Sequence, residues 1–143
     1  MTERIIITSG YFDPIHAGHI ECFELAKNLG GRLIVILNND KQAVLKKGRV
    51  FMPQNERKKI LESIKHIDEV FDCIDEDKSV CKSIKAIAEK HKGKEIIFAK
   101  GGDRFAGNIP EAILCRELGI RIVDGLGDKI QSSSNLTGIK EIK

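Results

Sequence analysis

The strongest structural signal in the chain is a ten-residue stretch near its beginning, G-Y-F-D-P-I-H-A-G-H at positions 10–19. It follows an apolar run at residues 5–7, which predicts a buried strand. It precedes residues 20–29, whose pattern indicates an amphipathic helix. The stretch is therefore expected to form a strand-to-helix turn. The helix after such a turn presents unpaired backbone N–H groups and partial positive charge at its N-terminus, and both attract anions.

The residues inside this turn favour a phosphate-rich ligand. Gly10 and Gly18 have no Cβ, so a phosphate can approach the backbone closely. His16 and His19 are three residues apart, close to one helical turn, so both can face the same ligand. The combination suits a nucleoside triphosphate better than a metal ion or a covalent nucleophile.

The rest of the chain alternates between strand and helix patterns. Apolar runs that predict buried strands lie at residues 5–8, 33–37, 69–74, 96–99 and 120–123. Because such alternation gives a parallel sheet with right-handed crossovers, we expect one α/β domain over residues 1–143. Its predicted architecture is a single doubly wound, Rossmann-like, five-stranded parallel sheet with helices on both faces.

Two details of the connections can also be predicted. Residues 41–49 are expected to form a basic loop, followed by a helix that Pro53 opens and whose apolar stripe runs through Ile60, Leu61, Ile64 and Ile67. Ligands of such sheets bind outside the carboxyl ends of the strands. The segments at 8–19, 100–104 and just before Ser132 are therefore expected to build one site.

Composition excludes several classes of function. The contents of 41% hydrophobic and 31% charged residues are ordinary for a soluble globular protein. The net charge of +3 is weak evidence for nucleic-acid binding, and a chain with no Trp and one Tyr lacks an aromatic base-stacking platform. No apolar run approaches the roughly 20 residues that span a bilayer. We expect neither a nucleic-acid nor a membrane partner.

The cysteines indicate a reducing compartment. They are scattered, with no C-x-x-C pair and no histidine at zinc spacing, so we predict no protein-held metal. No signal peptide is visible at the N-terminus, and the expected location is the cytoplasm. We predict that four side chains are buried thiols outside any disulfide: Cys22, Cys73, Cys81 and Cys115.

The stretch at 10–19 resembles the signature of the HxGH nucleotidyltransferases, the cytidylyltransferase-like superfamily. Its members include glycerol-phosphate cytidylyltransferase, phosphopantetheine adenylyltransferase and the heptose-phosphate adenylyltransferases of lipopolysaccharide core biosynthesis. Residues 132–134, Ser-Ser-Ser, resemble the family's second signature, I-S-S-S or I-S-T-T before the last helix. The heptose-phosphate type looks closest, through Lys-Gly-Gly-Asp at 100–103 and the short single-domain layout.

The resemblance implies roles for the histidines and for two lysines. His16 and His19 are expected to be catalytic, holding the triphosphate and stabilising charge at the α-phosphate in its five-coordinate transition state. Lys46 and Lys47 lie where the family carries a lysine loop that neutralises phosphate oxygens. We assign catalysis to Lys46 and substrate binding to Lys47, the alternative being a solvated charge run.

The resemblance also implies a nucleotide-binding set along the carboxyl edge of the sheet. In this set an aspartate contacts the ribose, and hydroxyl groups hold the β- and γ-phosphates. A simple turn at Asp103 and plain helix capping by the serines are the alternatives. The expected nucleotide-binding residues are Gly10, Tyr11, Phe12, Gly18, Gly101, Asp103, Ser132, Ser133 and Ser134.

Asp13 and Arg57 complete the prediction as substrate-binding residues. Asp13 can instead be an Asx-turn residue that shapes the signature. Arg57 lies in N-E-R-K-K at 55–59, which resembles the family's E-[HR]-R element near the substrate and the dimer interface; a solvent-facing side chain is the alternative. We expect a homodimer through this face.

The reaction that the resemblance implies needs no covalent enzyme intermediate. A phosphate oxygen of the acceptor attacks the α-phosphorus of the nucleotide in line, and Mg²⁺ is held largely by the triphosphate. Glycerol-phosphate cytidylyltransferases carry R-T-E-G-I-S-T, whose arginine lies near the cytosine and whose position here is Gly127. This donor set is absent, whereas Phe12 and Ile130 could form an apolar slot for adenine.

We therefore predict ATP over CTP, with AMP transferred to a sugar phosphate or a similar acceptor. The alternatives are a glycerol-phosphate-type cytidylyltransferase, an FAD synthetase, and a non-catalytic nucleotide-binding regulatory domain.

Overall fold

The computed structural model describes residues 3–101 and 110–126. The longest helix in these ranges has 11 residues, and none is long and apolar enough to cross a bilayer. In chain order the elements are β1 (Arg4–Gly10), α1 (Ala17–Lys27), β2 (Arg32–Leu37), α2 (Asp40–Lys47), α3 (Gln54–Glu62), β3 (Glu69–Asp72), α4 (Cys81–Lys90), β4 (Glu95–Gly101), α5 (Pro110–Leu118) and β5 (Arg121–Leu126).

The strands form a five-stranded sheet in the order β3-β2-β1-β4-β5, and every neighbouring pair is parallel. The predicted doubly wound, Rossmann-like architecture is confirmed. Strand order reverses between β1 and β4, because the chain adds β2 and β3 on one side of β1 and then crosses to the other. Such a switch point is where ligands of open parallel sheets bind. The signature follows β1, so it lies at this point.

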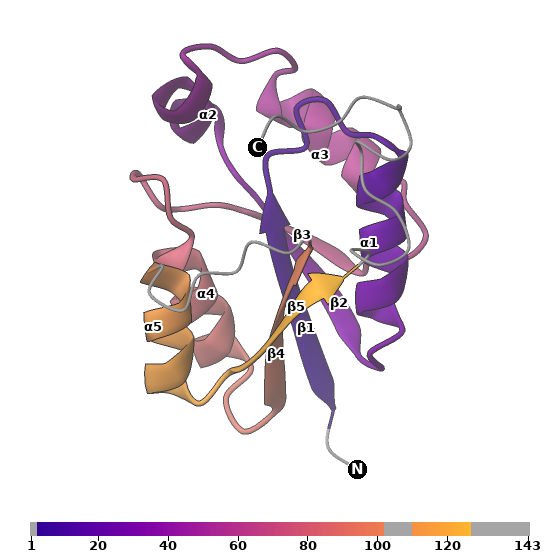
Figure 1. Cartoon of the computed structure of the whole chain (residues 1–143), viewed down its shortest axis with the longest axis vertical. Helices are drawn as coiled ribbons and strands as arrows, with labels where there is room; N and C mark the ends of the chain where they lie inside the picture. The colour runs from indigo at the N-terminus through magenta and orange to yellow at the C-terminus, as the bar shows by residue number, and fades with distance from the viewer. Residues whose placement is uncertain (1–2, 102–109, 127–143) are drawn as a thin grey trace.

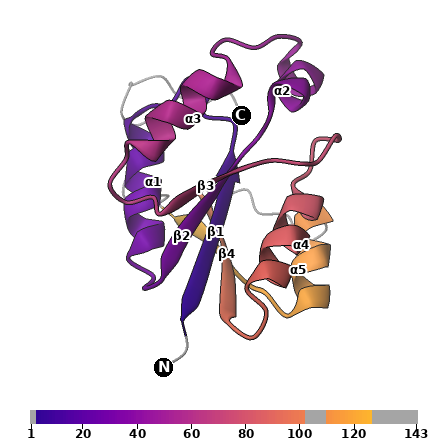
Figure 2. The ribbon, with the colours of Figure 1, turned by 180° about the vertical axis from the view of Figure 1, so that it is seen from behind.

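Each face of the sheet has its own hydrophobic core, because side chains alternate along a strand. Helices α1 and α3 cover one face, and α4 and α5 cover the other (Figures 1 and 2). In β1, Ile6 packs on the first face with Phe23 of α1, whereas Ile5 and Ile7 pack on the second with Ile84 of α4. The continuous apolar runs in the sequence thus belong to strands that are covered on both sides.

The expected loop at 41–49 is wrong, because residues 40–47 form helix α2. Asn39 caps this helix by accepting from the Gln42 N–H at 2.8 Å, and the Gln42 side chain accepts from the Asn39 N–H at 3.0 Å. Gly48 ends it with φ of 84°. The N-x-x-Q capping box and the glycine stop were both visible in the sequence. Figure 1 shows α2 beyond the carboxyl end of the sheet, the end that carries the signature.

Two other predictions need correction. Helix α3 ends at Glu62, so Ile64 and Ile67 lie in the following turn, where they still pack partly against the core. None of the cysteines forms a disulfide, but only Cys73 and Cys115 are fully buried, whereas the other two are partly exposed. Burial raises the pKa of the Cys115 thiol to about 11, which makes it a poor nucleophile at neutral pH.

Candidate active site

The signature turn between β1 and α1 is built around the ring of Phe12. This residue has φ of 52°, a left-handed conformation that bulky side chains rarely adopt. Its ring is 6% exposed, packs against Phe23 with 5.3 Å between centroids, and meets the His19 ring edge-on at 5.0 Å. A Cβ on Gly10 would lie 2.6 Å from the tip of the Phe12 ring. Gly10 is therefore required for this packing, a role that the sequence did not reveal.

His16 and His19 cap helix α1 through their Nδ1 atoms. His16 Nδ1 accepts from the Gly18 N–H at 3.1 Å, and His19 Nδ1 accepts from the His16 N–H at 3.0 Å. The rings stack with 3.8 Å between centroids. An imidazole whose Nδ1 accepts a hydrogen bond carries its proton on Nε2. Each ring therefore keeps an Nε2–H donor at a helix N-terminus, an arrangement suited to phosphate oxygens.

The electrostatic surroundings keep His19 neutral. Burial lowers its pKa to about 4, and the positive potential of His16 and of the Lys47 ammonium group acts in the same direction. Lys47 belongs to α2 and donates to the carbonyl oxygen of Asp13 in the signature, so α2 and the signature are in contact. A neutral imidazole that donates from Nε2 can stabilise a developing negative charge through this hydrogen bond.

This state of His19 predicts an unusual titration. The imidazole resonances of His19 should not move between pH 8 and roughly pH 5.5, and should shift only near pH 4. The unfolded chain takes up this proton near pH 6.5, so His19 lowers stability as the pH falls from 6.5 to about 4, and adds no further loss below that. NMR of histidine-labelled protein measures this directly, with His19→Asn to assign the signal. A midpoint above pH 6 would contradict the structure.

Helix α2 brings its two C-terminal lysines to the signature. The Lys46 Nζ lies 4.6 Å from the centroid of the Tyr11 ring, and the Lys47 Nζ lies 5.9 Å from it. Lys47 also donates to the carbonyl oxygen of Asp13 at 3.0 Å. The predicted neighbourhood of lysines and histidines is present in the structure, although the lysines belong to a helix rather than to a loop.

Asp13 fastens the signature to the segment that follows α2. Its two carboxylate oxygens accept from the N–H groups of Phe51 at 2.9 Å and Met52 at 2.6 Å. Burial acts to raise the pKa of this carboxyl, but the two backbone hydrogen bonds outweigh it and leave the pKa below its usual value. Asp13 thus holds the turn against residues 51–52, a long-range contact that differs from the local Asx turn suggested as the alternative. Its role in substrate binding stays a prediction.

Arg57 supports the signature from inside the protein. Its side chain is 0% exposed. It donates to the carbonyl oxygens of Tyr11 at 2.7 Å and Asn38 at 2.9 Å, and to that of Met52 at 2.8 Å. It also pairs with Asp40, the first residue of α2, at 2.6 Å. The expectation of a substrate-facing or dimer-facing Arg57 is corrected, because a guanidinium enclosed in this way cannot reach either partner.

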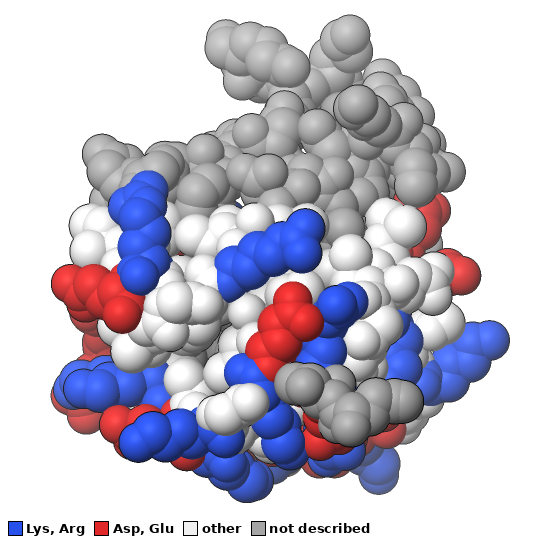
Figure 3. All heavy atoms as spheres, turned by 90° about the horizontal axis from the view of Figure 1, so that it is seen from below, with Lys and Arg blue, Asp and Glu red and all other residues white. Residues whose placement is uncertain are grey.

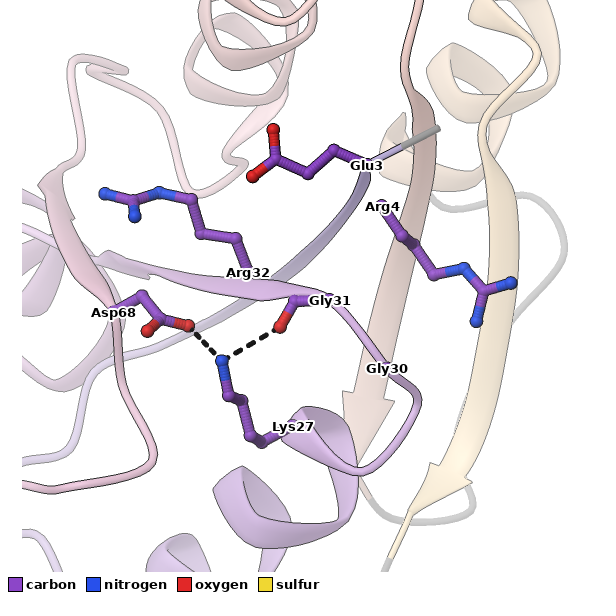
Figure 4. Close-up of a pocket in the computed structure, with 7 residues that line it drawn as sticks. All are labelled: Glu3, Arg4, Lys27, Gly30, Gly31, Arg32 and Asp68. Carbon is purple, nitrogen blue, oxygen red and sulfur yellow. Dashed lines mark hydrogen bonds and ion pairs between the residues drawn. The ribbon is translucent and has the colours of Figure 1, made fainter. Parts of the chain in front are cut away.

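A hollow with a volume of about 430 Å³ lies at the opposite, amino end of the strands. Basic and acidic side chains alternate over this end of the molecule (Figure 3). Figure 4 shows Lys27 held between the carboxylate of Asp68 and the carbonyl of Gly31. Each basic residue that lines the hollow has an acidic partner: Arg4 with Glu95, Lys27 with Asp68 and Arg32 with Glu69. We therefore take the signature as the candidate active site.

Comparison with known proteins agrees with this geometry. A family model described as Cytidylyltransferase-like matches residues 7–136. The chain belongs to this family. It is a cytidylyltransferase-like nucleotidyltransferase, and the resemblance seen in the signature is confirmed.

Relatives of this cytidylyltransferase-like chain differ in their named activities. Bifunctional protein HldE of Pelobacter propionicus is 34% identical over 138 residues, which is 95% of this chain and 25% of that protein. Glycerol-3-phosphate cytidylyltransferase of Bacillus subtilis is 42% identical over 65 residues, 46% of this chain and 50% of that one. FAD synthase of Pyrococcus horikoshii is 39% identical over 66 residues, 46% of this chain and 45% of that one. The chain spans about a quarter of the length of the HldE relative.

A solved structure shows the same fold. The lipopolysaccharide core biosynthesis protein from Thermoplasma volcanium superposes with a TM-score of 0.64 at 22% identity, covering 87% of this chain and 96% of that one.

The remaining predicted residues of this cytidylyltransferase-like site fall into three groups. Gly101 ends β4, next to β1 at the switch point, as expected. Phe12 was expected to contact the base but is a core residue beneath His19, because its positive φ turns the ring inward. Four predicted residues lie outside the described ranges: Asp103, Ser132, Ser133 and Ser134.

Sequence reasoning missed the residues that anchor α2. The Gln42 side chain is 0% exposed and donates to the carbonyl oxygens of Asp77 at 2.7 Å and Ser79 at 2.8 Å. The Asn39 side chain donates to the carbonyl oxygens of Cys73 at 3.1 Å and Asp75 at 3.0 Å. The capping-box spacing could have revealed the helix, but not these partners, which follow strand β3.

Proposed function

We propose that the chain transfers AMP from ATP to a phosphorylated small molecule, such as a sugar phosphate, and releases pyrophosphate. The observation that carries this proposal is the stacked histidine pair at the start of α1, in which His19 is neutral, together with the α2 lysines that contact the same signature turn. Membership of the cytidylyltransferase-like family supports it independently.

The site is suited to an in-line displacement. An oxygen of the acceptor phosphate attacks the α-phosphorus, the new P–O bond forms as the bond to pyrophosphate breaks, and pyrophosphate leaves with the electron pair. The attacking phosphate is already ionised, so no general base is needed. Negative charge grows on the equatorial oxygens and on the leaving group, and fixed N–H and ammonium donors stabilise it most in the transition state. His16, His19 and Lys46 are the proposed donors.

Mg²⁺ enters this scheme with the nucleotide. Among residues 3–101 and 110–126, no three His, Cys, Asp or Glu side chains lie close enough together to hold a metal ion. The carboxylate within the signature, that of Asp13, already accepts from two backbone N–H groups. The residues at the site therefore fit an ion whose ligands are water and phosphate oxygens, as Mg²⁺ prefers. Such an ion would neutralise triphosphate charge.

The choice of ATP rests on the absence of a cytosine-reading motif. Positions 127–130 read Gly-Asp-Lys-Ile, where glycerol-phosphate cytidylyltransferases carry R-T-E-G. A site built to hydrogen-bond one base discriminates strongly, and removal of its donors removes that discrimination. Phe12 is buried, so it cannot form part of the proposed adenine slot. The preference for ATP therefore rests on the missing R-T-E-G motif alone.

A pyrophosphate-release assay tests the proposal. ATP and CTP, each with Mg²⁺, are combined with heptose phosphate, glycerol 3-phosphate, phosphopantetheine and flavin mononucleotide. We expect turnover with ATP and a sugar phosphate, at least tenfold above that with CTP. Turnover with CTP and glycerol 3-phosphate would move the chain to the cytidylyltransferases, and ATP with flavin mononucleotide to FAD synthesis. Nucleotide binding without any turnover would support the non-catalytic alternative.

A further inference from the structure

The Tyr11 side chain is not explained by the catalytic scheme. Its neighbour Phe12 enters the core on the α1 face. Burial, together with the negative potential of Cys73 and Glu111, raises the pKa of the Tyr11 hydroxyl. In the described part of the chain this buried hydroxyl has no hydrogen-bond partner. A buried hydroxyl without a partner is unfavourable. The hydroxyl therefore does not account for the position of Tyr11.

The Tyr11 ring lies beneath the two lysines of α2. The Lys46 ammonium group is 4.6 Å from the ring centroid, well within the range of a cation–π contact, and that of Lys47 is near the limit at 5.9 Å. Lys47 has a second anchor in the Asp13 carbonyl oxygen. The main chain beneath the ring is also fixed, because the Tyr11 carbonyl oxygen accepts from the buried Arg57.

The contact matters because a lysine side chain is costly to order. Lys46 lies on an exposed helix end, and a long flexible side chain loses much rotamer freedom when it binds a phosphate. A partner that already holds the ammonium group near its working position removes part of this cost before the ligand arrives. An aromatic face suits this task, because it attracts a cation without neutralising its charge, as a carboxylate would.

We propose that Tyr11 is a positioning residue whose ring holds the ammonium group of Lys46 in place for the phosphate chain of the nucleotide. The inference rests on the proposed function in one respect, namely that phosphates bind between the α2 lysines and the histidine pair. It makes the aromatic ring, and not the hydroxyl, the part of Tyr11 that matters.

Calorimetric titration with inorganic triphosphate and Mg²⁺ tests the inference without a base or an acceptor. Tyr11→Leu should weaken binding about two- to fivefold, the strength of an exposed cation–π contact. Tyr11→Phe keeps the ring and should bind as the wild type does. In a Lys46→Met background, Tyr11→Leu should have no further effect, because the two residues act through one contact. Lys41→Met, at the other end of α2, is the matched control and should leave binding unchanged.

Fluorescence gives a second readout, because Tyr11 is the one tyrosine and the chain has no tryptophan. Triphosphate binding should change the tyrosine emission of the wild type, and Lys46→Met should largely abolish that change. This measurement keeps Tyr11, so it holds even if Tyr11→Leu folds poorly.

Three results would overturn the inference. The first is that Tyr11→Leu weakens triphosphate binding equally with and without Lys46. The second is that Tyr11→Phe weakens it as much as Tyr11→Leu does. The third is that the wild type does not bind triphosphate. The first two leave the proposed reaction intact. Conversely, binding that follows the expected pattern without pyrophosphate release from any nucleotide would reject the reaction and keep the role of Tyr11.

Discussion

Replacement of His19 by alanine is expected to lower kcat by roughly 100- to 1000-fold, the usual effect of removing one donor to a developing oxyanion. The KM for nucleotide should change little, because the Nε2–H group acts mainly in the transition state. Stopped assays of pyrophosphate release with the best nucleotide and acceptor of the wild type measure both constants. His66→Ala, which removes a histidine from a turn outside the site, is the matched control.

The capping role of His19 must be separated from its chemical role. His19 Nδ1 accepts from the His16 N–H, so alanine removes a helix cap, worth ~1 kcal/mol, together with the donor. His19→Asn places an amide oxygen near the position of Nδ1 and has no counterpart of Nε2. We expect it to keep most of the stability and to lose as much kcat as His19→Ala. A His19→Asn enzyme within threefold of wild-type turnover would show that the imidazole only caps the helix.

Arg57→Ala is expected to lower the free energy of unfolding by about 3–5 kcal/mol, as loss of one member of a buried charged network does. The substitution leaves three carbonyl oxygens, those of Tyr11, Asn38 and Met52, without their donor. Urea denaturation followed by circular dichroism measures the change. A domain of this size has only about 5–15 kcal/mol of stability in total, so the effect should be plain.

Two control variants show where this stability originates. Asp40→Ala removes the partially exposed partner of Arg57 and the acceptor of the Gln54 N–H, but leaves the three carbonyl contacts of Arg57 in place, so it should cost less than Arg57→Ala. Arg49→Ala, in the exposed segment after α2, should change stability by at most about 0.5 kcal/mol. If Arg57→Ala costs no more than Asp40→Ala, the carbonyl contacts are not what makes Arg57 important.

Much of the fold could be predicted because its signals are local. Buried strands read as apolar runs and helices as a 3.6-residue period, and the alternation of the two leaves few topologies other than a doubly wound parallel sheet. The signature at 10–19 was equally readable, since a strand, a glycine turn and two histidines at helix spacing are neighbours in sequence. The missed helix α2 is a failure of the same local reading, because its N-cap and C-cap residues were both present.

The supporting residues depended on contacts between distant parts of the chain. Arg57 is 46 residues from Tyr11 and 19 from Asn38, and these three meet only because β1 and β2 are neighbours in the sheet. A basic residue in a charged helix reads as exposed until the packing around it is known. The same applies to Asp13, whose backbone partners at 51–52 lie beyond two helices and a strand.

The sequence alone was sufficient for the class of fold and the family, and it singled out the two histidines as candidates, because each depends on residue types at short spacing. The tertiary structure decided how those residues are supported: Phe12 beneath His19, Arg57 inside the turn, and Tyr11 under Lys46. The physical reason is that a side chain's burial and partners depend on which strands are adjacent. Strand order follows from packing of the whole chain and leaves no trace in any one segment.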